Sequence, residues 1–212
     1  MKRLAVWVIL SLIVLLGLGT GLYAVTNDFQ LGRDIQIINS SPKKDYVIAT
    51  INGTIPITLA EFEVRKIMFQ ANGQSKSNAD IIQALVEEKM VYEEAKRRGI
   101  TVSDQEFESA INFYKESFKE LDKPQNAEAK KQMDEFLAGL GMSAKDYWED
   151  PVILDSYRTL LHRAKLLGQV SGEIDRPDGQ IHPIEEMELV EARMRSFAKD
   201  AQVEIIDDKY KK

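Results

Sequence analysis

The sequence from Val47 to Phe62, VIATINGTIPITLAEF, constrains the fold more than any other part of the chain. An Asn-Gly pair lies between two short apolar runs, and this pair is favoured where both central residues of a tight turn need a positive φ. The pattern predicts a β-hairpin over residues 46–57. Thr58 and Glu61 then form a capping box, in which each side chain accepts a hydrogen bond from the backbone amide of the other residue. A hairpin is therefore expected to lead directly into a helix.

The same helix-start signal recurs at Ser103 and, in a weaker form, at Ser143. Apolar positions with a helical period follow each start. Together they predict helices at residues 59–71, 79–98, from Ser103 to the turn at Pro124, 127–140, 151–167 and from Pro183 onward. Residues 168–180 are rich in Gly, Asp and Pro and predict a loop.

The end of the chain carries a second strand signal, AQVEII at residues 201–206, followed by a tail at 208–212 that we expect to be solvated. A lone hairpin is marginally stable in water. We therefore expect the C-terminal strand to pair with the strand at residues 46–51 and to close the domain. The predicted fold class is mainly α with a small β element.

An uncharged run of 22 residues, Leu4 to Val25, follows Lys2 and Arg3. At 1.5 Å per residue a helix of this length spans about 33 Å, enough to cross a hydrocarbon core of about 30 Å. We expect residues 1–25 to form an uncleaved, single-pass transmembrane signal-anchor in the cell membrane, with the basic N-terminus in the cytoplasm and the body outside. A cleaved signal peptide, giving a secreted protein, is the alternative, although Leu22 is bulky for a cleavage point after Ala24.

Residues 26–45 are polar, and we expect them to form a linker between the anchor and a domain at residues 46–207. A short strand at residues 35–38 is the one regular element considered within this linker. The expected role of the segment is that of a flexible tether.

Composition excludes several classes of function. The chain of 212 residues has no cysteine, which excludes disulfides, thiolate metal sites and a cysteine nucleophile. Its net charge of −6 argues against binding to nucleic acid, which needs clustered basic residues. His162 and His182 are the only histidines, and their spacing matches no metal-ligand motif. The sequence therefore predicts no catalytic residue, no metal and no cofactor.

Three segments have a recognisable pattern: ATING at 49–53 with IT at 57–58 and EF at 61–62, LVEEKMV at 85–91 with EA at 94–95, and RGITVSD at 98–104 with Glu106. The pattern resembles the N-terminal module of the SurA and PrsA group of extracytoplasmic chaperones. LGMS at 140–143 and Tyr147 extend the resemblance over residues 46–207. Only residues 168–182 separate the long helix from the last one, so the parvulin isomerase domain that usually follows this module is absent. We expect no enzymatic activity.

The resemblance and the anchor together imply a membrane-anchored, extracytoplasmic chaperone that binds unfolded or exported polypeptides without a cofactor. The alternatives are a docking module for one specific membrane or envelope partner, and a degenerate peptidyl-prolyl isomerase. Met and aromatic side chains adapt to varied apolar partners. The candidates for client binding are Phe62, Met68, Phe69, Tyr114, Phe118, Tyr147 and Trp148. For each of them, packing in the core is the competing explanation.

Overall fold

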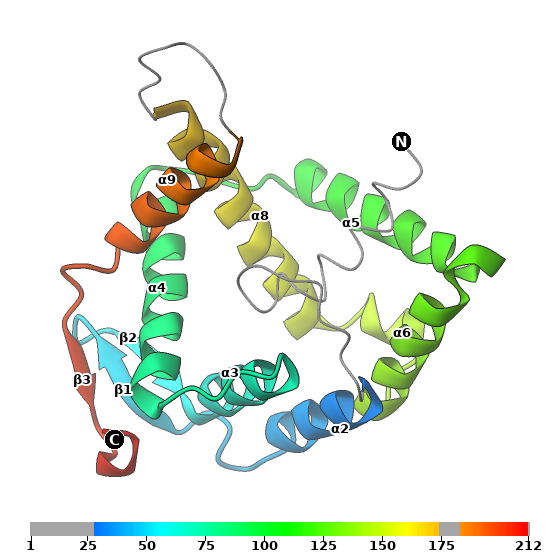
Figure 1. The fold of residues 1–212 in the computed structure, drawn as a ribbon, viewed down its shortest axis with the longest axis horizontal. Coiled ribbons are helices and arrows are strands. Elements are labelled where there is room, and N and C mark those ends of the chain that lie inside the picture. The colour runs from blue at the N-terminus through cyan, green and yellow to red at the C-terminus, as the bar shows by residue number, and fades with distance from the viewer. Residues whose placement is uncertain (1–27, 174–182, 212) are drawn as a thin grey trace.

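The computed structural model describes residues 28–173 and 183–211, which form a mainly helical body with one small antiparallel sheet (Figure 1). The elements in chain order are α2 (Asp28–Asn39), β1 (Val47–Ile51), β2 (Ile55–Thr58), α3 (Leu59–Ala71), α4 (Asn78–Arg97), α5 (Asp104–Lys119), η1 (Glu120–Asp122), η2 (Pro124–Asn126), α6 (Ala127–Leu140), α7 (Ala144–Tyr147), α8 (Pro151–Glu173), α9 (Pro183–Ser196), β3 (Val203–Ile205) and η3 (Asp208–Tyr210). At this level the predicted fold class is confirmed.

The transmembrane helix predicted at residues 1–25 lies outside the described residues. Within the described part of the chain, no helix combines the length and the apolar character needed to span a bilayer.

The sheet has the strand order β2-β1-β3. Asn52 and Gly53 turn the hairpin with φ angles of 52° and 71°, as the Asn-Gly pair predicts. On its other side β1 pairs antiparallel with β3, with Ile51 opposite Val203. The Asn52 side chain accepts a hydrogen bond from the Gln202 amide at 2.9 Å, and the Asn52 amide donates to the Gln202 carbonyl at 2.7 Å. The prediction that the C-terminal strand pairs with the first strand is therefore confirmed.

Complete capping boxes begin α3, α5 and α7, at Thr58, Ser103 and Ser143 as predicted. At α3, the Glu61 carboxylate accepts a hydrogen bond from the backbone amide of Thr58 at 2.8 Å. A further box that was not predicted begins α4, where Ser77 accepts the backbone amide of Asp80. Because each box satisfies amides that a helix start leaves without partners, these side chains fix where the helices begin.

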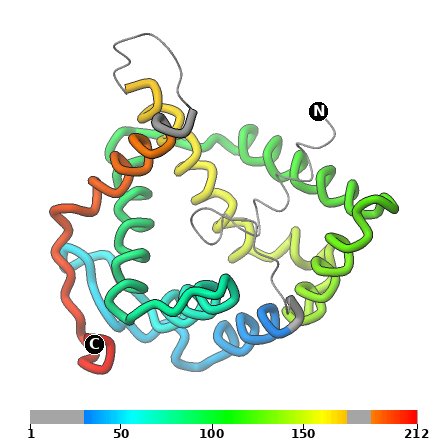
Figure 2. The backbone as a smooth tube through the Cα atoms, viewed as in Figure 1, coloured from blue at the N-terminus to red at the C-terminus, as the bar shows by residue number. Residues whose placement is uncertain are grey.

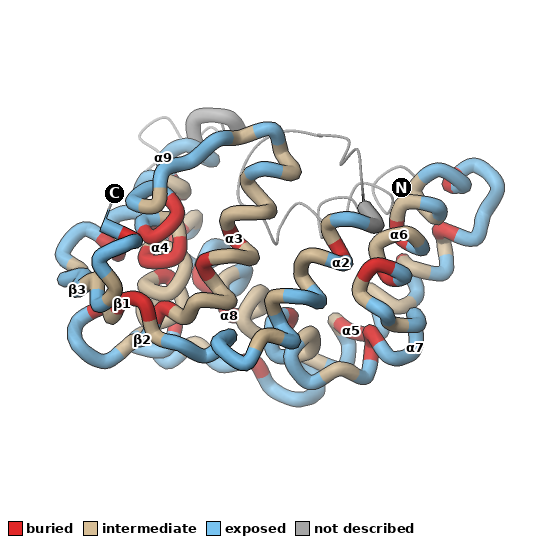
Figure 3. Tube along the Cα trace, turned by 90° about the horizontal axis from the view of Figure 1, so that it is seen from below, coloured by how far each residue is buried: buried red, intermediate tan, exposed pale blue. Residues whose placement is uncertain are grey.

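Among the described residues, the buried apolar side chains form three clusters rather than one continuous core. Figure 3 marks the buried residues along the backbone. The sheet cluster joins the strands to α3 and α4, the aromatic cluster joins α5, α6, α7 and the start of α8, and the α9 cluster joins the ends of α4 and α8 to α9. Their main members are Ile48, Ile51, Ile57, Phe62, Ile81 and Leu85 in the first, Ile111, Leu121, Leu137, Tyr147, Trp148 and Tyr157 in the second, and Val91, Ala95, Leu166, Val170, Val190 and Met194 in the third.

Helix α8 continues to Glu173, so the loop predicted from residue 168 is wrong for residues 168–173. Two glycines in this last part of the helix each cost about 1 kcal/mol relative to alanine. Leu166 and Val170 are fully buried in the α9 cluster. Their burial outweighs the weak helix propensity of the glycines, which is why the local composition was misleading.

The linker predicted at residues 26–45 is also wrong over much of its length, because residues 28–39 form α2 and the strand considered at 35–38 is helical. Helix α2 packs against α6, and a Cβ added at Gly32 would lie 2.3 Å from the backbone oxygen of Phe136 and 3.1 Å from the carbonyl carbon of Gly139. Only glycine permits so close a crossing. Since α2 also packs against α3, it connects the two ends of the body (Figure 2).

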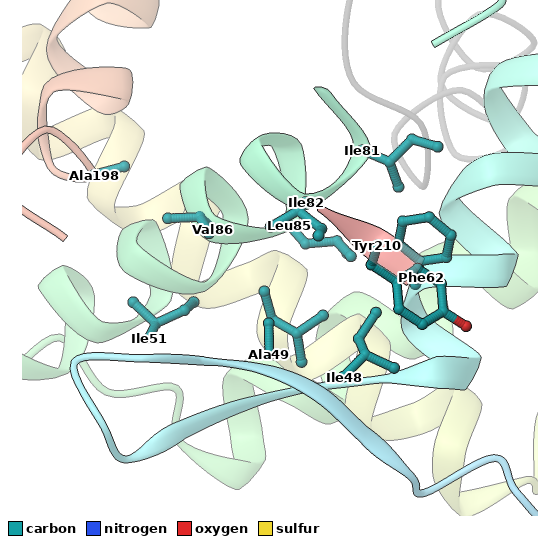
Figure 4. Packing of buried hydrophobic residues seen from close by; sticks show 11 residues of the cluster. Ile48, Ala49, Ile51, Phe62, Ile81, Ile82, Leu85, Val86, Ala198 and Tyr210 are labelled. Atoms are coloured by element: carbon teal, nitrogen blue, oxygen red, sulfur yellow. The ribbon is translucent and has the colours of Figure 1, made fainter. Parts of the chain in front are cut away.

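The tail predicted at residues 208–212 is not solvated throughout. Tyr210 in η3 is 3% exposed and belongs to the sheet cluster. Its ring meets the edge of Phe62 with the centroids 4.8 Å apart and an interplanar angle of 68° (Figure 4). One aromatic residue among charged ones carries no period, so the sequence pattern contained no signal for this contact.

We expect Gly32→Ala to destabilise the chain by about 1–3 kcal/mol, because the added methyl group would overlap the α6 backbone. Hydrogen exchange of the α2 amides and urea unfolding measure this effect. The matched control is Gly168→Ala in α8, where a Cβ meets nothing within 4 Å and better helix propensity should stabilise by up to about 1 kcal/mol. Equal stabilisation by both replacements would contradict the close crossing.

Tyr210→Ala is expected to destabilise the chain by about 3–5 kcal/mol, as measured by urea unfolding, because a large buried ring is lost from the sheet cluster. Tyr210→Phe serves as the control. The hydroxyl has no hydrogen-bond partner among the described residues, so its removal should change stability by less than about 1 kcal/mol. A small effect of the alanine variant would contradict the role of Tyr210 in the sheet cluster.

Candidate functional site

The candidates for client binding do not meet on one surface. Phe62 is 1% exposed in the sheet cluster, and Phe69 is partly buried against the same cluster. Met68 lies on the same helix but is half-buried and is not a member of any of the three clusters. The remaining candidates lie in or against the aromatic cluster, on α5 and at α7.

Trp148 is the centre of the aromatic cluster, at the end of α7. Its ring centroid lies 5.8 Å from Phe118, 5.2 Å from Tyr147 and 5.4 Å from Tyr157, and the first two contacts are edge-to-face. Tyr114 reaches the group through Tyr157 at 5.2 Å. Such aromatic pairs add about 0.5–1.5 kcal/mol each beyond their area burial. These rings therefore hold α5, α7 and α8 together.

The two tyrosine hydroxyls of this cluster, on Tyr147 and Tyr157, lie 3.4 Å apart in a buried position. Burial raises the pKa of both phenols above the ordinary value, and for Tyr157 the nearby Tyr147 adds to the effect. Each phenol is consequently neutral at physiological pH. The geometry offers neither a base nor a free nucleophile, and it is that of a structural core.

A different apolar surface remains on α3, which is apolar on two opposite sides. Phe62 and Phe69 face the sheet cluster. At about 100° per residue, Val64, Ile67 and Met68 project from the opposite side of the helix. All three are half-buried, and none is a member of the three clusters of the described residues. We call these three residues the second face of α3.

The orientation of the second face of α3 is fixed by ion pairs between α3 and α4. Arg65, 7% exposed, forms an ion pair with Glu88, and Lys89 binds Glu61 at 2.6 Å. Because these charges lie between the two apolar sides of the helix, α3 cannot rotate without breaking them. The second face is held in place while its opposite side packs in the core.

Arg163 of α8 places a further positive charge near this junction. Burial lowers the pKa of its guanidinium, and the carboxylate of Glu88 partly offsets this shift. An arginine remains protonated at neutral pH even so, because its ordinary pKa is above 12. The junction of α3, α4 and α8 therefore combines the Arg65–Glu88 ion pair with an additional cation, Arg163.

No metal chemistry is evident in the part of the chain that the structure describes, since no group of His, Asp and Glu side chains is arranged to hold an ion. His162 is 9% exposed, its Nδ1 lies 2.9 Å from the Arg158 carbonyl, and its ring packs edge-on against Tyr92. These contacts make His162 a packing residue between α4 and α8. His182 lies outside the described residues.

Two residues of the second face of α3, Val64 and Ile67, were not among the sequence candidates. The period of the helix already marked them as apolar positions on a second side. What the sequence lacked was the location of the sheet, which decides which side becomes the core.

Comparisons with protein families, with curated proteins and with solved structures find no match for this chain.

The buried phenols predict a loss of stability in alkali. Tyr147 and Tyr157 have a higher pKa folded than unfolded, so their contribution is fully present below pH 10 and is lost as the pH rises above it. Urea unfolding above pH 10 should show stability falling by about 1.4 kcal/mol per pH unit for each phenol. Tyr147→Phe or Tyr157→Phe should each remove part of this slope. A slope unchanged in the double variant would assign the loss to other groups.

Proposed function

We propose that this chain is a membrane-anchored, extracytoplasmic chaperone-like protein that binds unfolded or exported polypeptides by apolar contact, without isomerase chemistry. The proposal combines the resemblance to the SurA and PrsA module with the apolar run Leu4 to Val25. The observation that carries it is the second face of α3, a half-buried apolar surface on a helix whose other side is fully committed to the core.

The chemistry of this face suits weak and general binding. Val64, Ile67 and Met68 make no directional contacts, so an apolar segment of almost any sequence can pack on them, and methionine adapts its shape to its partner. Covering the remaining surface of one such side chain contributes roughly 1 kcal/mol. Three of them give modest affinity, which allows a bound polypeptide to be released without an energy source.

The surrounding charges favour solubility rather than a single partner. The chain carries a net charge of −6, and a net charge away from zero opposes association between copies of the protein. The fixed ion pairs that flank α3 add a polar border to the apolar face. An unfolded polypeptide supplies both apolar side chains and backbone amides, so it can use both parts of this surface.

Suppression of aggregation by the full-length protein in nanodiscs tests the proposal. Light scattering of a denatured reporter protein should fall at a several-fold molar excess of the chain. Met68→Ser is expected to raise the concentration needed by about fivefold, which corresponds to the loss of about 1 kcal/mol of apolar contact.

Met187→Ser is the matched control for that experiment. It makes the same chemical change at a methionine of α9 that is 53% exposed, and it should leave suppression unchanged. Circular dichroism checks that both variants remain folded. Loss of activity to the same degree in both variants, or no suppression by the unmodified chain, would contradict the proposal.

Crosslinking in cells separates the proposed function from its alternatives. A chaperone recovers many unfolded clients, whereas a docking module recovers one folded envelope partner.

A proline-peptide isomerisation assay tests the remaining alternative, and we expect no acceleration because the parvulin domain is absent from the sequence.

A further inference from the structure

The position of α2 restricts where the body lies relative to the apolar run at the N-terminus. Only Thr26 and Asn27 separate Val25 from the first residue of α2. Fully extended, the three steps from Val25 to Asp28 span roughly 10 Å. Since α2 is fixed to α6 and α3, no free tether separates the folded body from the end of this run.

The solvent side of α2 and the turn after it have an unusual composition. Ile37 is 57% exposed and Tyr46 is 49% exposed, both among the large apolar residues most accessible to solvent. Exposed basic side chains accompany them at Arg33, one helical turn before Ile37, and at Lys43 and Lys44. We call these five residues the outer face of α2. At about 100° per residue, Ile37 lies about 140° around the helix from Gly32, so it projects away from the crossing with α6. Helix α2 itself runs along the lower edge of the view in Figure 1.

The charge of this edge differs from that of the rest of the protein. Residues 28–46, which are α2 and the turn after it, contain three basic and three acidic side chains and are neutral overall, in a chain whose net charge is −6. One of the acids, Asp34, accepts a hydrogen bond from the Gln30 amide at 2.6 Å. An acidic body is repelled by anionic headgroups, so an approach to a bilayer favours an edge that is neutral overall and exposes the basic side chains of Arg33, Lys43 and Lys44.

We propose that the outer face of α2 rests on the headgroup region of the bilayer that the run Leu4 to Val25 crosses. Arg33, Lys43 and Lys44 contact anionic headgroups, while Ile37 and Tyr46 enter the interface, where aromatic and apolar side chains are favoured next to basic ones. This inference rests on the anchor in the proposed function, but it does not depend on chaperone activity.

Contact with the bilayer would give the body a fixed orientation. The short connection at residues 26–27 limits the distance of α2 from the membrane, and the outer face of α2 selects which side turns toward it. Because α2 is bound to both α3 and α6, this orientation is transmitted to the whole body. A client-binding surface on α3 would then lie close to the membrane.

Fluorescence quenching by lipid tests this arrangement on the full chain, which contains no cysteine and therefore takes a single label. The variant Ile37→Cys, carrying an environment-sensitive fluorophore, is reconstituted into vesicles of phosphatidylcholine and phosphatidylglycerol with brominated acyl chains. The matched control is Met187→Cys, at a site with a similar exposure of 53% against 57%. We expect at least threefold stronger quenching at position 37 than at position 187.

Charge dependence provides the second arm of the test. Replacing Arg33, Lys43 and Lys44 together by glutamine should reduce the quenching at position 37 at least twofold, as should vesicles of pure phosphatidylcholine. If the protein floats with the vesicles but quenching is equal at positions 37 and 187, the bilayer contact is overturned and the anchor stands. Failure of the protein to float with the vesicles would overturn both the anchor and the contact. Suppression of aggregation is measured in a separate experiment, so loss of the bilayer contact does not by itself contradict the proposed chaperone activity.

Discussion

Helix α8 is the element on which the arrangement of the other helices depends, because its two ends belong to different clusters. Tyr157 packs among the aromatic rings near α7, whereas Leu166 and Val170 pack against α4 and α9. A helix of 23 residues is about 34 Å long and stiff over that distance. It therefore sets the separation between the aromatic cluster and the α9 cluster, and α4 in turn links the latter to the sheet.

The second connection between the two ends of the body is made by α2, and it is of a different kind. Where α8 contributes large side chains to two cores, α2 crosses α6 at a point where backbone meets backbone beside Gly32. Each small cluster alone buries few residues, so their mutual support through α2, α4 and α8 replaces a single large core. Because the clusters are small, the sheet cluster covers only one side of α3 and leaves Val64, Ile67 and Met68 half-buried.

Local signals in the sequence were sufficient for most element boundaries. The Asn52-Gly53 turn and the caps at Thr58, Ser103 and Ser143 depend on residues within four positions of each other, and the structure contains all of them. The features that were missed depend on distant neighbours. Tyr210 is buried only because β3 brings it to Phe62, and α2 is ordered against α6 through Gly32.

For the candidate site too, local signals were informative and contacts with distant residues were not predicted. The sequence of α3 has apolar residues on more than one side of the helix, but the aromatic residues chosen as client-binding candidates largely pack in or against cores. Large rings and methionines are common to cores and to binding surfaces. Only the position of the sheet and of α4 separates Phe62, which is buried, from Met68, which is not.

The pairing of β1 with β3 determines when this protein acquires its structure. The backbone and side chain of Asn52 are bound to Gln202, 150 positions later in the chain. During synthesis the hairpin emerges well before its partner strand β3 and the ring of Tyr210. Contacts of such long sequence separation form slowly. Until those later residues have been synthesised, one edge of β1 lacks its partner strand and Phe62 lacks the ring of Tyr210. Over that interval the nascent chain is itself a polypeptide in need of protection.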